Sequence, residues 1–232
     1  MIPLSRRFIA EFLGSLLLAG VVIGSGILGE RLADGNAGVA LLANTAATAA
    51  ILFVIITALA PISGAHFNPV VTLVMVLRRE LRLGDGAGYV ICQIGGCVAG
   101  ALLAHAMFEL PLLQEGTHER SGLAQGLSEA VAAFTLVLTI LLVSRARPNA
   151  VAAAVALAIA AGYWWTASTT FANPAITLAR AMSDTFAGIR MTDAPVFIVA
   201  QIIGALIASG VASALGAGAE RAKGAGGGRA IQ

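Results

Sequence analysis

The sequence is poor in charged residues, cysteines and aromatic side chains. Only 11% of its 232 residues are charged, whereas soluble domains carry about 25%. It also lacks a Ser-His-Asp set, a phosphate-binding loop, a cluster of metal ligands and a basic patch suited to nucleic acid. We therefore expect a protein that is not an enzyme, that has no cofactor or metal, and that does not bind nucleic acid.

The two cysteines are too few for a disulfide framework. Cys92 and Cys97 lie in one apolar run, and their spacing fits no metal site, so we expect both to be small buried hydrophobic residues. Hydrophobic residues make up 58% of the chain, and the mean hydropathy is +0.90. These values are typical of a membrane protein, whose main partner is the lipid bilayer.

Six apolar runs are long enough to cross a bilayer. They cover about 8–28, 38–60, 87–108, 124–144, 150–167 and 194–215. The first follows two arginines, as a signal peptide would, but it is long and lacks a convincing cleavage site, so we expect a retained span.

Two shorter apolar segments, 68–77 and 173–182, interrupt this pattern. Nine helical residues extend roughly 13 Å, about half of a hydrocarbon core of roughly 30 Å. Each segment begins with Asn-Pro; Asn is a strong N-cap, and Pro suits the first helical position. We expect two half-helices that enter the membrane without crossing it. The box residues are Asn68, Pro69 and Val70 in the first and Asn173, Pro174 and Ala175 in the second.

The two halves of the chain carry the same set of motifs and form an internal repeat. Repeat one covers about 6–110 and repeat two about 122–215, within a single domain of residues 1–232, and 216–232 is expected to be a flexible tail. Each repeat holds three spans, an odd number, so the second enters the membrane inverted. The predicted fold is therefore an all-α membrane protein with six transmembrane helices and two re-entrant half-helices in an inverted repeat.

The basic residues are distributed unevenly between the two sides of the predicted spans. One side carries ten of them and the other carries four, which predicts a multi-pass protein with both termini in the cytoplasm. The ten are Arg6, Arg7, Arg78, Arg79, Arg82, Arg145, Arg147, Arg221, Lys223 and Arg229; the four are Arg31, Arg120, Arg180 and Arg190.

Two acids occupy matching positions inside apolar spans. Glu11 lies in the first span and Glu129 in the fourth. A carboxylate near the bilayer centre costs roughly 2.5–3.5 kcal/mol on insertion scales, so each needs a partner. These two acids could instead lie at the membrane surface, or they could form a proton relay. Their matching positions in the two repeats favour a structural role over both alternatives.

The paired boxes resemble the two Asn-Pro-Ala boxes of the aquaporin, or major intrinsic protein, family; Val70 departs from that pattern. The resemblance implies that Glu11 and Glu129 accept hydrogen bonds from the re-entrant loops, and that Asn68 and Asn173 donate to passing oxygens. Opposed half-helix N-termini would repel cations, hydronium included.

The resemblance also assigns a selectivity filter by offset from the boxes. It falls on Thr48, Ala161, Thr170 and Ile176. The last position is usually arginine in the family, so we expect a wide filter that lacks both arginine and aromatic residues.

Such a filter resembles the aquaglyceroporin branch associated with bacterial arsenic resistance. That resemblance implies a passive channel in the bacterial inner membrane, a homotetramer, that passes water, glycerol, and arsenite or methylated arsenicals. The alternatives are an ion- or proton-coupled small-solute transporter and a non-conducting scaffold.

Arg180 lies four residues after Ile176, on the same face of the predicted half-helix. We expect it in the outer vestibule, as a displaced positive charge that attracts oxyanions, with Asp184 as its partner. The alternative is an arginine that snorkels to the membrane surface.

Overall fold

The structure is a computed structural model that describes residues 2–226, with side chains described as far as Gly216. Within residues 2–226 it contains helices and no strands. The elements are α1 (Leu4–Leu32), α2 (Ala37–Ser63), α3 (Pro69–Leu77), α4 (Leu83–Met107), α5 (Leu123–Ala146), the 3₁₀ turn η1 (Pro148–Ala150), α6 (Val151–Trp165), α7 (Pro174–Ala181) and α8 (Ala194–Gly226).

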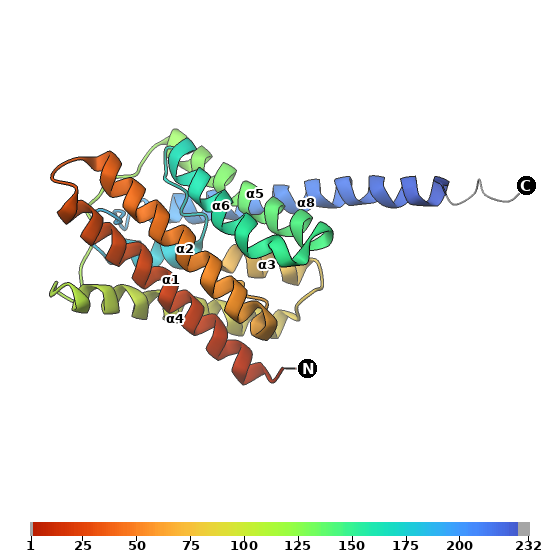
Figure 1. The fold of residues 1–232 in the computed structure, drawn as a ribbon, viewed down its shortest axis with the longest axis horizontal. Coiled ribbons are helices and arrows are strands. Elements are labelled where there is room, and N and C mark those ends of the chain that lie inside the picture. The colour runs from red at the N-terminus through yellow and green to blue at the C-terminus, as the bar shows by residue number, and fades with distance from the viewer. Residues whose placement is uncertain (1, 227–232) are drawn as a thin grey trace, which may run out of the picture.

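Six helical segments are long and apolar enough to cross a membrane: α1, α2, α4, α5, η1 together with α6 (Pro148–Trp165), and α8. The helices α3 and α7 are the two short ones, with nine and eight residues. The predicted fold class, with six spans and two half-helices, is confirmed. The long helices pack side by side as a bundle (Figure 1).

The two halves of the chain are built alike. In the first half α1 packs against α2 and α4, and in the second half α5 packs against α6 and α8. The two halves join along α2 and α6, and α3 contacts α7. The half-helices therefore lie between the repeats, where a pathway through the bundle would have to run.

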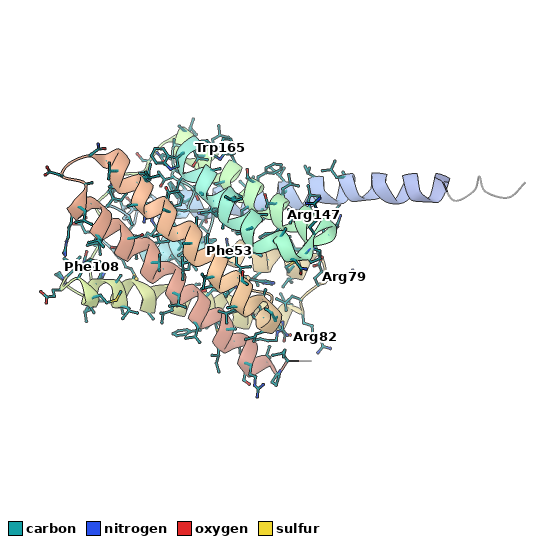
Figure 2. The ribbon with its side chains drawn as sticks, viewed as in Figure 1. Phe53, Arg79, Arg82, Phe108, Arg147 and Trp165 are labelled. Carbon is teal, nitrogen blue, oxygen red and sulfur yellow. The ribbon has the colours of Figure 1, made fainter. Side chains whose placement is uncertain are left out.

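The start of α1 and the end of α8 lie on the same side of the bundle (Figure 1). Arg79, Arg82 and Arg147 lie at that end, whereas Phe108 and Trp165 lie at the opposite one (Figure 2). We call these the arginine end and the tryptophan end. This arrangement agrees with an even number of spans.

The tail predicted from residue 216 begins inside a helix. The helix α8 continues without a break to Gly226 and projects beyond the bundle (Figure 1). Alanine recurs through this segment, and alanine has the highest helix propensity of all residues. The rest of the predicted tail, 227–232, lies outside the described residues.

The closest helix packing in the first half depends on glycine. Gly100 of α4 lies against the backbone of α1, where an added Cβ would collide with the carbonyl oxygen of Leu16. A side chain at Gly100 would therefore push the two helices apart, because backbone cannot move aside as a flexible side chain can.

We expect Gly100→Ala to lower the thermal stability of the purified protein in detergent. Overpacking of this kind costs about 1–3 kcal/mol. The matched control is Gly84→Ala on the same helix, because no described atom lies within 4 Å of the Cβ position at Gly84. Equal melting temperatures for the two variants would contradict the packing argument.

Candidate pore

Both half-helices begin at the asparagine of their box. The side-chain Oδ1 of Asn68 accepts the N–H of Val70 at 3.0 Å, and Oδ1 of Asn173 accepts the N–H of Ala175 at 3.0 Å. Each asparagine has extended backbone angles, and proline follows at the first helical position. The short helices thus start where N-cap chemistry predicts.

The two asparagines are also bonded across the interface between the repeats. Nδ2 of Asn68 donates to the carbonyl of Ala172 at 2.8 Å, and Nδ2 of Asn173 donates to the carbonyl of Phe67 at 2.8 Å. The half-helices therefore meet N-terminus to N-terminus. An amide nitrogen carries two hydrogens, so each asparagine retains a second donor, and both residues line the central cavity.

Glu11 anchors the first re-entrant loop. Its fully buried carboxylate accepts the N–H of His66 at 3.0 Å and of Phe67 at 2.8 Å, and the hydroxyl of Ser63 at 2.6 Å. The loop needs this support, because Ala65 and Phe67 have left-handed backbone angles that are costly for residues other than glycine.

Glu129 does the same in the second half. It accepts the N–H of Phe171 at 2.9 Å and of Ala172 at 2.8 Å. Here Thr169, Thr170 and Ala172 are the left-handed residues. Both carboxylates are fully buried, so the alternative of surface acids does not describe this structure.

Sequence reasoning missed a glutamine that supports each acid. Nε2 of Gln93 donates to Glu11 at 2.7 Å, and Nε2 of Gln201 donates to Glu129 at 2.6 Å. Their equivalence in the two repeats is visible in the sequence. A buried acid and a buried glutamine repeated in register indicate a hydrogen-bonded pair.

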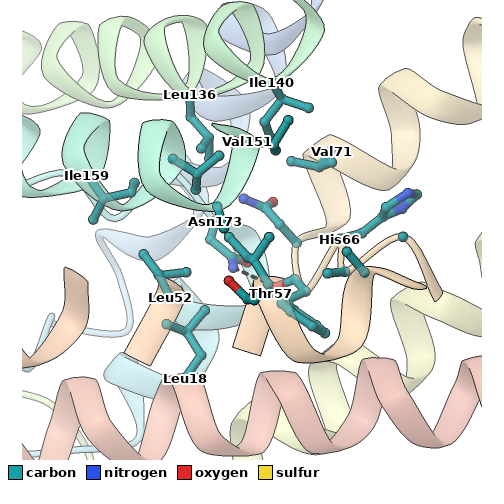
Figure 3. Close-up of a pocket in the computed structure, with 18 of the residues that line it drawn as sticks. Leu18, Leu52, Thr57, His66, Val71, Leu136, Ile140, Val151, Ile159 and Asn173 are labelled. Atoms are coloured by element: carbon teal, nitrogen blue, oxygen red, sulfur yellow. Dashed lines mark hydrogen bonds between the residues drawn. The ribbon is translucent and has the colours of Figure 1, made fainter. Parts of the chain in front are cut away.

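A cavity of about 680 Å³ runs through the bundle past both asparagines. Apolar side chains from several helices surround the space near Asn173, among them Leu52, Leu136 and Ile159 (Figure 3). The polar lining is largely confined to the re-entrant loops and the cavity ends. The side of the pathway formed by the re-entrant loops thus offers hydrogen-bonding groups, whereas the side formed by the long helices is apolar.

Three of the four predicted filter residues come together in this cavity. Thr48, Thr170 and Ile176 line it, and all are buried. Ile176 is followed one helical turn later by Arg180, which lines the cavity as well.

The prediction for Ala161 is wrong. Ala161 is exposed on the outside of α6 and does not line the cavity. Tyr163, two residues further along the same helix, lines the cavity instead, with its hydroxyl 3.2 Å from that of Thr48. Each residue turns a helix by about 100°, so an offset error of two residues moves a side chain to another face. The cavity lining beside Thr48 therefore contains an aromatic residue, whereas the predicted filter had none.

The surroundings predicted for Arg180 are also wrong in part. Its side chain is 2% exposed, so it does not snorkel to the surface. Asp184 is not its partner, because that carboxylate accepts the hydroxyl of Thr117 at 2.6 Å. Arg180 instead donates to the carbonyl of Ala187 and lies over the ring of Phe171, 3.3 Å from its centroid.

The described residues contain no group of three or more His, Cys, Asp or Glu side chains that could hold a metal ion. The polar side chains along the cavity carry amide, hydroxyl and guanidinium groups, together with the imidazole of His66 and the carboxylate of Glu80. These groups can bind and orient a solute through hydrogen bonds.

A helical bundle in which opposed half-helices meet beside a continuous cavity is the architecture of a membrane channel. A family model described as major intrinsic protein matches residues 1–150 and 144–229. The chain belongs to this family.

Two curated relatives and one solved structure describe the likeness further. Aquaglyceroporin AqpS of Rhizobium meliloti (strain 1021) is 53% identical over 205 residues, 88% of each chain. Glycerol uptake facilitator protein-like 6 of Lactiplantibacillus plantarum is 36% identical over 102 residues, 41% of each chain. The aquaglyceroporin from Plasmodium falciparum shares the fold, with a TM-score of 0.70 and 19% identity over 89% of this chain and 94% of that one.

Proposed function

We propose that this member of the aquaglyceroporin channels conducts small uncharged solutes passively, through the cavity that passes Asn68 and Asn173. The observation that supports the proposal best is the reciprocal bonding of these two side chains. It leaves one free donor on each at the middle of the cavity. A solute oxygen can accept from both, which replaces part of its hydration.

Ions should pass poorly. Each half-helix N-terminus presents about half a positive elementary charge, and the two are held together at mid-cavity. A proton wire would also be interrupted, because a water that accepts from both amides cannot donate along the pathway in both directions.

The range of solutes depends on the filter. Ile176 stands where family members usually have arginine, which leaves Thr48, Thr170 and Tyr163 as the neighbouring polar groups. We propose that this opening admits glycerol and water, and also neutral arsenite or methylated arsenicals. The arsenic branch is proposed from the filter resemblance alone, whereas the identity with AqpS supports the aquaglyceroporin class.

Location and assembly belong to the same proposal. Arg79, Arg82 and Arg147 gather at the end where α1 begins and α8 ends (Figure 2), and basic residues favour the cytoplasmic side. We propose a bacterial inner-membrane protein with cytoplasmic termini. Large apolar side chains such as Ile91 and Leu157 are exposed on the bundle, where lipid or neighbouring copies in a homotetramer would cover them.

Stopped-flow measurements on proteoliposomes test this function. We expect glycerol, urea and arsenous acid to enter faster through the protein than through empty liposomes, with rates that do not depend on a pH gradient. Entry that requires a proton gradient would favour the coupled transporter, and no entry of any solute would favour the scaffold. Within the described residues, the two intramembrane acids are already occupied as loop anchors, which argues against coupling.

A further inference from the structure

Arg180 is a buried arginine whose charge has no carboxylate partner in the described part of the chain. Ion pairs there, within 4.0 Å, involve Arg7, Arg78 and Arg190 only. Arg180 is 2% exposed. A buried charge that is neither paired nor fully hydrogen-bonded is costly, so its retention here calls for an explanation.

The side chain is held rigidly. Its Nε donates to the carbonyl of Ala187, and its guanidinium lies over the ring of Phe171. That ring is itself fixed by Phe197 of α8, at 5.1 Å between centroids and 71° between planes. Stacking on an aromatic face and a bond at Nε orient a guanidinium while leaving its two terminal nitrogens available.

In the part of the chain that the structure describes, those terminal nitrogens remain free beside the cavity. Arg180 lines the cavity, and within the described residues neither terminal nitrogen has a hydrogen-bond partner or is sealed from solvent. They lie on the same helix as Ile176, one turn (about 6 Å) nearer the tryptophan end. The family's usual arginine is replaced by Ile176, and Arg180 places a positive charge one helical turn away.

A second arginine, Arg120, lies near Arg180 over the same aromatic ring, but two of its nitrogens are hydrogen-bonded to loop carbonyls. The guanidinium of Arg120 also lies over Phe171, at 5.1 Å, but it donates to the carbonyls of Gly188 and Ser168 and does not line the cavity. Arg120 is used to fix loops. Arg180, in contrast, lines the cavity and keeps donors that no described residue uses.

We propose that Arg180 forms a binding site for a small oxyanion at the tryptophan end of the cavity. The planar fork of a guanidinium matches two oxygens of one anion, and an anion would supply the missing countercharge. Bound there, it would hinder neutral solutes from passing. This last effect rests on the proposed channel function, whereas the binding itself does not.

The test uses methanesulfonate, which is anionic at neutral pH and carries three acceptor oxygens. Thermal unfolding of the full-length protein in detergent is followed as methanesulfonate replaces chloride at constant ionic strength. The wild-type midpoint is expected to rise saturably. Arg180→Gln should need at least about tenfold more anion for half the effect, which corresponds to about 1.4 kcal/mol. Arg180→Lys should also bind more weakly, because it lacks the fork.

The matched control is Arg31→Gln. Arg31 also donates to a carbonyl and lies over a phenylalanine ring, both belonging to Phe108, but it is exposed and does not line the cavity. It should respond as the wild type does. No saturable response in the wild type, or the same response in both Arg180 variants and the wild type, would overturn the site.

A flux measurement separates this site from the channel proposal. In proteoliposomes, methanesulfonate should slow glycerol entry through the wild type and have at least about tenfold less potency on Arg180→Gln. If the wild type passes no glycerol at all, the channel proposal fails while the unfolding result still decides the anion site. Glycerol entry in the variant without anion shows that it is folded.

Discussion

Replacing Glu11 with alanine is expected to abolish most solute permeation and to destabilise the protein. The carboxylate accepts two backbone N–H groups of the first re-entrant loop. Without it, each buried donor is left unpaired at a cost of about 1–3 kcal/mol. The left-handed residues Ala65 and Phe67 would lose their support. Glycerol permeability should fall at least about tenfold, equivalent to about 1.4 kcal/mol on the barrier, as measured by stopped-flow light scattering.

The control is Glu30→Ala on the same helix. Glu30 is exposed, so its removal should leave both permeability and melting temperature close to those of the wild type. Glu11→Gln separates shape from charge. It keeps an acceptor but loses the charge-assisted bonds, and an intermediate loss is expected. Wild-type permeability in Glu11→Ala would show that the loop does not depend on this anchor.

Replacing Ile176 with arginine is expected to close the filter to larger solutes. Ile176 is 4% exposed and lines the cavity, so a longer, charged side chain there would project into the pathway. It would also stand one turn from Arg180, and like charges at this spacing repel. Glycerol and arsenous acid entry should fall at least about tenfold, and water entry much less, because pore diameter limits the larger solutes first.

The control for size and charge is Ile176→Val, which keeps an apolar, branched side chain of nearly the same volume. It should conduct glycerol at close to the wild-type rate. If Ile176→Arg reduced water and glycerol entry by the same factor, the change would reflect general blockage or misfolding, and the proposed role of this position in solute size selection would be rejected.

Much of the fold follows from the sequence because it rests on local chemistry. An Asn-Pro pair before a short apolar run fixes the start of a half-helix at Asn68 and at Asn173. Glu11 and Glu129 cannot remain in apolar spans without donors, and the re-entrant loops supply them. Parity of the spans then determines the inverted repeat.

The filter was less predictable because it depends on rotation and on loop contacts. Counting back from Asn173 leads to Ala161, although Tyr163 is the residue of α6 that reaches Thr48. The position of the Arg180 guanidinium depends on the carbonyl of Ala187, in a loop whose course no motif specifies. A helix face can be misassigned by a small error in counting, and a loop carbonyl has no sequence signature.

The reciprocal asparagine bonds have a consequence for biogenesis. The carbonyl that accepts from Asn68 belongs to Ala172, 104 residues further along the chain. At a synthesis rate of about 5–20 residues per second, a ribosome needs roughly 5–20 s to cover that distance. During that time the side chain of Asn68 cannot form its bond to Ala172. The first half-helix therefore reaches its final hydrogen-bonded state only once the second half has been inserted.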